Sequence, residues 1–426
     1  MIKKFNAPRL RFPGFTDEWE QRKLGEIFEY LQNNTLSRNS LNYKNPNIKN
    51  IHYGDILVKF DEILDGSNKD IPYINSELDL SKFSKSLLRD GDVIFSDTAE
   101  DDTVGKAIEL QNVNEPFILS GLHTIPCRPL ITFGKGYLGN FLNSNSYRMQ
   151  LRPLVQGIKV SSISKSALKD TMIEYPKNLD EQEKIGSLFY HIAKMITLHQ
   201  HKITNLIFKK KALLQKLFPI NGYPYPEIRF PGFNDAWEQR KLGSIGSTYT
   251  GLSGKTKEDF GHGEAQYITY LNVFQNTISD ITMTDKVEID TTQNEVKCGD
   301  VLFTTSSETP EEVGMSSVWL GATPNIYLNS FCFGFRPNQK IDPYFLGYSL
   351  RAPYMRDKIK ILAQGISRYN ISKNKVMELE ISLPNNEEQK LLGSFLQRID
   401  LIITLHQRKL NHLKLQKKAL LQQLFV

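Results

Sequence analysis

A phrase that occurs twice is the feature that most constrains this chain. Arg-Phe-Pro-Gly-Phe begins at Arg11 and again at Arg229, and Trp-Glu-Gln-Arg-Lys-Leu-Gly begins at Trp19 and again at Trp237. The offset is 218 residues, about half of the 426. Repetition on this scale predicts one structural frame built twice. The segments after the two phrases differ almost completely, so we expect the frame to hold two unlike inserts.

Composition places the chain among ordinary globular proteins. Its 426 residues suffice for two or three domains, and 40% hydrophobic with 23% charged residues are typical values. The first residues lack the apolar segment of a signal peptide, and no apolar run approaches the roughly 20 residues of a membrane span. Cys127, Cys298 and Cys332 lie far apart, which predicts reduced thiols in a cytoplasmic protein. The net charge of +6 is compatible with a nucleic-acid partner without requiring one.

Further landmarks recur in the same order at a smaller offset of 208 residues. Gly-Asp followed by a hydrophobic run begins at Gly91 and Gly299, and Gln-Gly-Ile begins at Gln156 and Gln364. The second copy has therefore lost about ten residues before its Gly-Asp turn, and surface loops tolerate such changes. Each Gly-Asp pair predicts a turn that enters a buried strand. Short strand patterns alternate with turns and helices, so we expect a compact mixed α/β domain in each copy.

Each half ends in a long helical pattern, over 181–218 and 387–425, at an offset of 207 residues. A heptad seam of apolar residues fits both segments. The predicted seam positions are Ile185, Leu188, Ile192, Met195, His199, Lys202, Leu206 and Leu213, then Leu392, Phe395, Ile399, Ile402, His406, Lys409, Leu413 and Leu420. A helix of this length spans about 57 Å and needs a partner for its apolar stripe. The nearest candidate partner is its own duplicate.

A histidine and a lysine interrupt both predicted seams, at His199 and Lys202 and again at His406 and Lys409. We interpret His199 and His406 as packing or solvated residues of the helix surface. Fixing the register of the helix pair is the alternative role. Metal binding is disfavoured, because no acidic or cysteine cluster accompanies either histidine.

Two motifs resemble nucleotide-binding loops but fail their own requirements. Gly134 to Gly139 matches the GxGxxG pattern, yet no acidic residue follows about 20 positions later, as a dinucleotide site needs. Gly254-Lys255-Thr256 lacks the earlier glycine of a phosphate-binding loop, since Tyr249 stands there. No HExxH, GxSxG or zinc-spaced Cys/His set occurs. The chain therefore looks like one that binds and positions, with catalysis carried by other proteins.

Taken together, the repeated motifs resemble the specificity subunit of type I restriction–modification enzymes. The resemblance rests on the Arg-Phe-Pro-Gly-Phe opening, the Gly-Asp strand, the Gln-Gly loop and the Lys-Lys-Ala-Leu-Leu-Gln helix end, in order and twice over. It implies two target-recognition domains, joined by two long antiparallel coiled-coil helices in a pseudo-two-fold repeat. The expected segments are recognition domains at 1–178 and 222–385 and spacer helices at 179–221 and 386–426.

The resemblance also implies a function and a set of partners. Each recognition domain reads one half of a split, asymmetric site in double-stranded DNA, and the helices set the gap. The subunit is not an enzyme by itself. It recruits two modification subunits, which methylate adenine with S-adenosylmethionine, and two restriction subunits, where present, which use ATP and Mg. No cofactor is expected on this chain, and its location is cytoplasmic.

The candidate DNA contacts are polar and aromatic residues near the repeated landmarks, because Arg and Lys suit guanine while Asn and Gln suit adenine. In the first copy they are Arg38, Tyr53, Ser96, Asp97, Thr98, Lys106, Lys159, Ser161 and Ser162. In the second copy they are Lys255, Thr256, Tyr270, Asn272, Thr304, Thr305, Ser306, Ser307, Ser367, Arg368, Tyr369 and Asn370. Arg38, Lys159 and Lys255 are expected to contact phosphates, which position without specifying. An ordinary polar loop, or a core position for the tyrosines, is the alternative for each residue.

Two other readings of the sequence stay open. The chain could be a stand-alone sequence-specific DNA-binding protein, which would bind its site tightly without any partner. It could also be a protein–protein scaffold, which would show no salt-dependent affinity for DNA. The modest charge and the long apolar helices favour a subunit. The opening phrase is expected to be a structural cover of each domain, with a docking surface for a partner as the alternative.

Overall fold

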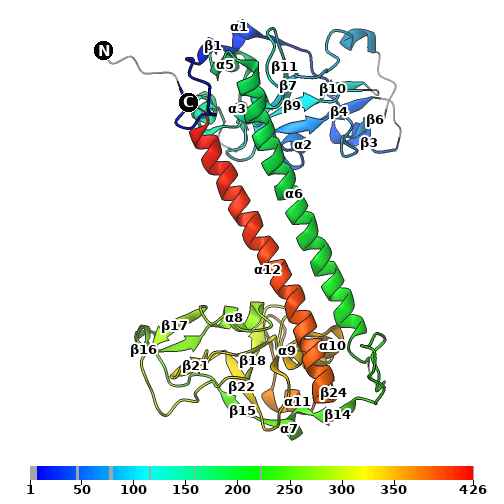
Figure 1. Ribbon diagram of the computed structural model, residues 1–426, viewed down its shortest axis with the longest axis vertical. Helices are drawn as coiled ribbons and strands as arrows, with labels where there is room; N and C mark the ends of the chain where they lie inside the picture. Colours follow the sequence, from blue (N-terminus) through cyan, green and yellow to red (C-terminus); the bar gives the residue numbers. More distant parts are fainter. Residues whose placement is uncertain are drawn as a thin grey trace. The chain divides into compact units, whose positions relative to one another are not determined.

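The computed structural model describes residues 7–44, 48–75, 80–114, 117–157, 159–220 and 223–425. Its contacts divide the chain into two compact units (Figure 1). Unit 1 consists of Met1–Gln200 with Arg408–Val426, and unit 2 consists of His201–Gln407. The two long helices, α6 (Leu179–Lys216) and α12 (Asn386–Gln423), therefore each begin in one unit and end in the other.

Unit 1 has two sheets in the part of the chain that the structure describes. The larger sheet has the strand order β2 (Phe28–Tyr30), β11 (Thr124–Pro129), β7 (Val93–Ser96), β9 (Ala107–Gln111) and β5 (Ile63–Asp65). The smaller has the order β10 (Ile118–Ser120), β4 (Lys49–Ile51), β6 (Tyr73–Ile74) and β3 (Leu41–Asn42). Two ribbons pair β1 (Glu20–Lys23) with β13 (Met172–Tyr175), and β8 (Thr98–Ala99) with β12 (Ser161–Ser162). The short helices are α1 (Leu24–Ile27), α2 (Tyr53–Val58), α3 (Tyr137–Leu142), α4 (Asn145–Leu151) and α5 (Lys165–Lys169), with 3-10 turns at Arg38–Ser40, Leu80–Phe83 and Arg152–Leu154.

Unit 2 repeats this plan, with one strand fewer in each of its two sheets among the described residues. Its main sheet has the order β15 (Gly246–Thr250), β22 (Cys332–Pro337), β18 (Val301–Thr304) and β20 (Ser316–Val318). A second sheet has the order β17 (Thr284–Val287), β16 (Phe260–Ile268) and β21 (Ile326–Leu328). The ribbons pair β14 (Glu238–Lys241) with β24 (Glu380–Leu383), and β19 (Ser306–Ser307) with β23 (Tyr369–Asn370). The helices are α7 (Leu242–Ile245), α8 (Tyr270–Gln275), α9 (Pro343–Arg351), α10 (Pro353–Ile361) and α11 (Lys373–Met377), with a 3-10 turn at Lys257–Asp259.

The Gly-Asp landmark holds the central sheet together in both units. Asp92, before β7, accepts two hydrogen bonds from the Arg128 guanidinium of β11, at 2.9 and 2.7 Å. Asp300, before β18, accepts two from Arg336 of β22, at 2.8 and 2.6 Å. Both carboxylates are buried, and a buried charge needs such a partner. The aspartate is therefore repeated because it joins the turn to the neighbouring strand.

The arginine of the opening phrase binds a glutamate in the first turn of a long helix in each unit. Arg11 makes a bidentate ion pair with Glu181 of α6, at 2.7 and 2.9 Å. Arg229 makes the same pair with Glu388 of α12, at 2.7 and 2.8 Å. Both glutamates are fully buried. A carboxylate near a helix N-terminus also suits the helix dipole, so the phrase clamps the start of each helix.

The tryptophan of the second phrase packs into each domain. Trp19 lies edge-on to Tyr137, with ring centroids 6.1 Å apart, and Trp237 lies edge-on to Phe345 at 5.8 Å. Both indoles are buried. This burial agrees with the expected role of the phrase as a structural cover.

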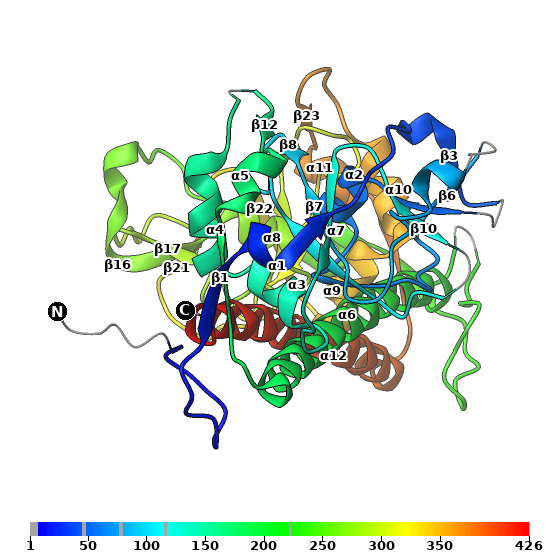
Figure 2. The same ribbon diagram turned by 90° about the horizontal axis from the view of Figure 1, so that it is seen from above.

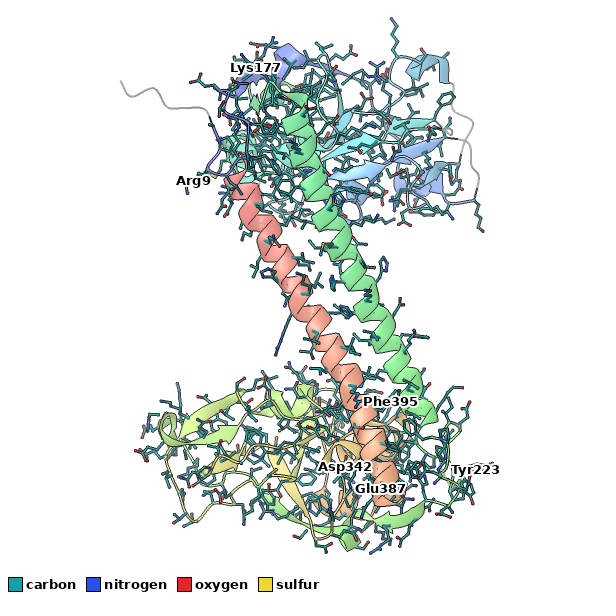
Figure 3. The ribbon with its side chains drawn as sticks, viewed as in Figure 1. Arg9, Lys177, Tyr223, Asp342, Glu387 and Phe395 are labelled. Carbon is teal, nitrogen blue, oxygen red and sulfur yellow. The ribbon has the colours of Figure 1, made fainter. Side chains whose placement is uncertain are left out.

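A glutamine next to each clamped glutamate fastens the domain to the helix. In unit 2, Gln389 accepts a hydrogen bond from the backbone N–H of Asp342, at 3.0 Å. Figure 3 shows Asp342 beside the first turns of α12, where Glu387 and Phe395 also lie. In unit 1, Gln182 accepts the equivalent bond from a glycine N–H of the loop before α3, at 2.8 Å. The Glu-Gln start of each long helix is thus a fixed joint of the frame.

The ends of the long helices complete the cores of the units. The helix-end residues in the core of unit 1 are Ile185, Phe189, Leu424 and Phe425. Those in the core of unit 2 are Leu217, Phe218, Leu392 and Leu396. The Leu-Phe pair at the end of the second repeat therefore belongs to unit 1, and the pair at the end of the first repeat belongs to unit 2. The start of one helix and the end of the other lie together in each unit, so the helices run antiparallel.

The long helices bury a seam that agrees with the predicted one at every second position. At the positions between, the buried residue is one place later in the sequence than predicted. The seam of buried and half-buried positions runs through 185, 189, 192, 196, 199, 203, 206, 210 and 213 of α6 to 217 just after it, and the seam of α12 lies 207 residues later. This 3-4 spacing is that of a coiled coil. Lys202 and Lys409 are exposed, so they do not interrupt the seam as predicted, whereas His199 and His406 are half-buried within it.

Lysine takes a later seam position in both helices. Lys210 of α6 forms an ion pair with Asp400 of α12 at 2.6 Å, and the Tyr348 hydroxyl donates to the same carboxylate at 2.7 Å. Lys417 of α12 forms an ion pair with Glu62, at 2.6 Å. The seam lysine therefore pairs with Asp400 of the opposite long helix in unit 2, but with Glu62 of the recognition domain in unit 1. The expected mixed α/β domains, antiparallel long helices and internal repeat are confirmed.

The GxGxxG segment of unit 1 binds a carboxylate of its own chain. Glu109 of β9 accepts hydrogen bonds from the backbone N–H groups of Gly136 (2.7 Å) and Gly139 (2.9 Å). Burial raises the pKa of Glu109 above its usual range, although the two N–H bonds oppose that shift. The N–H groups of both glycines are thus bound by a packed side chain of the same unit.

This carboxyl predicts a pH dependence of the stability of unit 1. The pKa of Glu109 is higher in the folded state than in the unfolded state, so the protonated carboxyl contributes to the folding stability of unit 1. This stability contribution is fully present below about pH 4.3 and is lost as pH rises through the folded pKa. The urea midpoint of unit 1 should therefore change less over this window in Glu109→Gln than in the wild type. Glu183→Gln, at an exposed site on α6, is the control and should keep the wild-type slope. An unchanged slope in Glu109→Gln would contradict the assignment.

Candidate nucleic-acid interface

Two candidate segments that lie far apart in sequence form one ribbon in each unit. In unit 1, Ser161 of β12 lies opposite Ala99 of β8, and Ser162 lies opposite Thr98. In unit 2, Ser306 and Ser307 of β19 lie opposite Asn370 and Tyr369 of β23, respectively. The loop after the Gly-Asp strand and the Gln-Gly loop therefore share one surface. The sequence placed both loops among the candidate contacts but did not predict that they pair.

The Gln-Gly turn is a tight hairpin that only glycine permits. An isolated bridge joins Gln364 to Asn370, and Gly365 has a φ of 136°. A Cβ there would clash with the backbone carbonyl of Arg368. Gly157 has the same conformation in unit 1. Figure 2 shows that β12 in unit 1, and β23 in unit 2, lie on the side of the unit away from α6 and α12.

In unit 2 the ribbon lines a pocket of about 520 Å³. Its lining residues are Tyr270, Leu271, Phe274, Ser306, Ser307, Glu308, Glu312, Ser367 and Arg368. The rings of Tyr270 and Phe274 stack with centroids 5.9 Å apart, and the Tyr270 hydroxyl donates to the Ser306 carbonyl at 2.6 Å. The pocket combines an aromatic floor with charged and hydroxyl side chains on its walls. Such a surface can bind base edges of DNA.

The side chains at this hairpin are strongly exposed. Ile366 at the tip is 96% exposed, and Ser367, Arg368 and Asn370 are also exposed. The Arg368 guanidinium lies over the Phe331 ring, 5.8 Å from its centroid. Phe331 did not appear among the sequence candidates, because no landmark surrounds it.

Unit 1 builds the equivalent surface from different side chains. Tyr53 lies between two imidazoles, with ring centroids 4.6 Å from His52 and 5.3 Å from His123. His123 Nδ1 is 3.3 Å from an Asp97 carboxylate oxygen, and Thr98 donates a hydrogen bond to that oxygen at 2.7 Å. His123 was missed by sequence reasoning. The signal that could have found it is its match, at offset 208, to Phe331 of unit 2.

Five candidates are buried, namely Ser96, Asn272, Thr304, Ser306 and Ser307. Ser306 and Ser307 still line the pocket, whereas the expectation of a surface contact is corrected for the other three. Ser96 donates to the Thr98 carbonyl at 2.8 Å, and Thr304 Oγ1 accepts from the backbone N–H of Met315 at 3.0 Å. Asn272 donates to the carbonyls of Asp280 and Met283 at 2.7 and 3.0 Å. Each side chain therefore satisfies a backbone group inside the fold.

Four other candidates are engaged by neighbouring groups. Lys106 is half-buried and donates to the Phe60 carbonyl at 2.8 Å, and burial lowers its pKa. Arg38 forms an ion pair with Asp55. Lys255 forms an ion pair with Asp290 at 2.9 Å, and Thr256 caps the following 3-10 turn. Thr305 remains near the cluster, where it donates to the Phe331 carbonyl at 2.8 Å.

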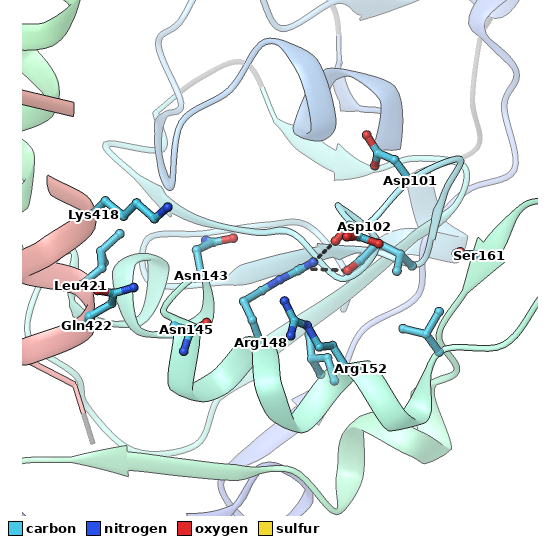
Figure 4. A pocket seen from close by; sticks show the side chains of 13 residues that line it. Asp101, Asp102, Asn143, Asn145, Arg148, Arg152, Ser161, Lys418, Leu421 and Gln422 are labelled. Atoms are coloured by element: carbon cyan, nitrogen blue, oxygen red, sulfur yellow. Dashed lines mark hydrogen bonds between the residues drawn. The ribbon is translucent and has the colours of Figure 1, made fainter. Parts of the chain in front are cut away.

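A second pocket in unit 1, of about 390 Å³, lies between α4 and the end of α12. Figure 4 shows Arg148 and Arg152 on one side and Lys418, Leu421 and Gln422 on the other. Arg148 donates to the carbonyls of Val104, at 2.8 Å, and Asp102. It therefore holds the loop between β8 and β9 in place. Arg356 does the same in unit 2, donating to the Gly314 and Val313 carbonyls at 2.7 and 2.6 Å.

Within the described ranges, no three His, Cys, Asp or Glu side chains gather in a way that could hold a metal ion. Among the same residues, no helix is long and apolar enough to cross a membrane.

The comparison with protein families identifies the repeat. The model of the type I restriction modification DNA specificity domain matches residues 16–207 and again residues 234–415. The chain belongs to this family. The two matches cover the two copies of the frame, so the family domain is present twice.

Similar proteins agree with this family membership. A putative type I restriction enzyme MjaX specificity subunit from Methanocaldococcus jannaschii is 23% identical over 442 residues, covering 98% of this chain and 95% of the relative. The S subunit of a type I restriction-modification system from M. genitalium has a similar solved structure, with a TM-score of 0.52, 14% identity and 99% coverage of both chains. A chain solved in a study of complex assembly and conformational transition of the type I R-M system has a TM-score of 0.54 and 17% identity, covering 98% of this chain and 99% of that one. These likenesses show that the specificity-subunit fold extends over almost the whole chain.

Proposed function

We propose that this specificity subunit reads a bipartite, asymmetric DNA site. The insert of each recognition domain, within 1–178 and 222–385, reads one half-site through its ribbon and hairpin. The long helices, within 179–221 and 386–426, separate the two readers and determine the gap. The observation that carries the proposal is the equivalent ribbon in both units, next to which an exposed hairpin carries different side chains in each unit.

The difference between the ribbons supports unlike half-sites. Unit 1 presents Lys159, Asp97 and His123 around its ribbon, whereas unit 2 presents Arg368 and Phe331. Different donors, acceptors and apolar groups match different base edges in the major groove. Identical readers in a pseudo-symmetric frame would favour a palindrome instead.

The same proposal includes partner proteins that carry the chemistry. Each long helix has exposed apolar residues at matching positions 207 residues apart. These pairs are Met195 and Ile402, Leu198 and Leu405, and Phe208 and Leu415. Repeated apolar patches suit two copies of one partner. We assign them to two modification subunits carrying S-adenosylmethionine, in the cytoplasm, with ATP and Mg belonging to restriction subunits where these join.

Mapping of adenine methylation tests the function directly. Cells that contain the modification subunit should methylate a two-part sequence only when this chain is also present. Replacing residues 26–171 by the insert of a relative keeps the opening phrase and both long helices, and should change only one half-site. A change in both half-sites would contradict the modular reading. Methylation that is independent of this chain would overturn the proposed function itself.

A further inference from the structure

The pocket of unit 2 carries opposite charges that are held apart. Glu312, on the segment between β19 and β20, accepts a hydrogen bond from Ser307 Oγ at 3.2 Å. Arg368, on the hairpin before β23, lies over the Phe331 ring. Both side chains line the pocket, and no ion pair joins them within the part of the chain that the structure describes. The pocket therefore offers a hydrogen-bond donor and an acceptor to the same ligand.

The balance of charge in this pocket disfavours a phosphate. A second carboxylate, Glu308, also lines it, so two negative side chains oppose the single guanidinium. A carboxylate repels a phosphate but accepts hydrogen bonds from an amino group. The ligand should therefore present an amino group beside a hydrogen-bond acceptor.

A G·C base pair presents both groups on one edge. In the major groove, guanine offers the acceptors N7 and O6, and cytosine offers its N4 amino group. Arginine donates two parallel hydrogen bonds that match N7 and O6, and glutamate accepts from the cytosine amino group. Arg368 and Glu312 have the chemistry that this edge requires.

The floor of the pocket is fixed by the fold. The half-buried Arg351 donates to the carbonyls of Val273 and Phe274 at the end of α8, at 2.8 and 2.9 Å. Its pKa is lowered to about 9 by burial. The Tyr270 hydroxyl of α8 is bonded to the Ser306 carbonyl. The tyrosine donor is therefore already used within the fold, which leaves the charged side chains and the serine hydroxyls to face a ligand.

Unit 1 lacks this pair of charges. At the offset of 208 residues, Val160 stands in place of Arg368. Around Glu312 the offset is 209, because Val104-Gly105 matches Val313-Gly314, and Thr103 stands in place of Glu312. A contact made by the pair would thus belong to one half-site alone.

Building on the DNA-reading function above, we propose that Arg368 and Glu312 form the specificity-determining pair of unit 2. They read one G·C base pair of its half-site. Arg368 donates to guanine, and Glu312 accepts from the amino group of the paired cytosine.

The test uses the full chain assembled with its modification subunits. Duplexes that carry each of the four base pairs at each position of the second half-site compete for methylation. The wild type should prefer G·C at one position. Arg368→Ala and Glu312→Gln should each reduce that preference roughly five- to 150-fold, the range expected for loss of a direct base contact. The preferences of the first half-site should not change.

A change in the DNA separates base reading from other roles of Arg368. 7-Deazaguanine at the same position removes the N7 acceptor, and should lower methylation by the wild type but not by Arg368→Ala. Arg240→Ala is the control variant, because it removes an equal charge from the β14 ribbon of the same unit and should keep every preference. Thermal melting of the Arg368 variant should match the wild type, because this side chain is exposed.

Three outcomes would overturn the inference. The second half-site could contain no preferred G·C pair, or Arg368→Ala could leave that preference intact. Arg368→Ala could also lower methylation of all duplexes alike, which would indicate a phosphate contact. These outcomes differ from failure of the proposed function, in which even the wild-type complex would methylate without a two-part preference.

Discussion

Replacing Phe425 by alanine should destabilise unit 1 by about 3–5 kcal/mol, the usual cost of removing a buried phenylalanine. Phe425 follows the last helix of the chain, yet its ring stacks on Phe189 with centroids 5.8 Å apart. It also meets Tyr137 and Phe141 edge-on, at 5.8 and 5.7 Å. Hydrogen exchange should show faster opening of the amides in β7 and β9, while those in β18 and β22 keep their protection.

Phe218→Ala is the matched variant and should have the reverse effect. Phe218 ends the helix of the first repeat, but it packs against Phe345 at 5.8 Å and Trp237 at 6.2 Å in unit 2. The amides of β18 and β22 should now exchange faster. If Phe425→Ala loosened unit 2, or Phe218→Ala loosened unit 1, the assignment of helix ends to the cores would be wrong.

Arg229→Ala should have a comparably large effect on unit 2. It leaves the carboxylate of Glu388, whose side chain is only 1% exposed, without the two hydrogen bonds that hold the pKa of Arg229 above its ordinary value. Removing one partner of a buried ion pair typically costs about 3–5 kcal/mol, because the remaining charge stays desolvated. The urea midpoint of unit 2 should fall accordingly, and Arg11→Ala should act in the same way on unit 1.

Two controls isolate the buried charge. Arg240→Ala removes one partner of the exposed pair between Arg240 and Glu238, and should change stability by no more than about 1 kcal/mol. The double variant Arg229→Met with Glu388→Leu removes both charges and should recover most of the lost stability. Equal destabilisation by the single and double variants would show that packing, rather than the unpaired charge, explains the loss.

Some of the candidate site could be predicted from residue types, but burial could not. Arg368 and Ser367 belong to a glycine-bearing turn, and a turn of that kind is exposed in almost any fold. Ser96, Thr304 and Asn272 look equally polar in the sequence. Their burial depends on carbonyl and N–H groups that distant segments bring to them. Residue type alone therefore cannot separate a base-reading side chain from one that satisfies the backbone.

In the seam of the long helices, too, the sequence predicts the pattern but not which side chain is buried. Its period was predicted correctly, but Leu188 and Phe189 are both apolar, as are Met195 and Ile196. Either residue of each pair fits a heptad pattern. The side chain that becomes buried is decided by the position of the opposite helix and the domain cores, which select Phe189 and Ile196.

The duplicated frame, the long helix at the end of each copy and the resemblance to a specificity subunit can all be recognised from the order of the residues. These conclusions depend on repetition and periodicity, which are properties of order along the chain. The location of the Leu-Phe end of each repeat in the core of the other unit, and the pairing of the β8 and β19 segments with the Gln-Gly hairpins, become visible in the folded chain alone. Those contacts join residues far apart in sequence, and they form because buried apolar and backbone groups must find partners wherever the fold supplies them.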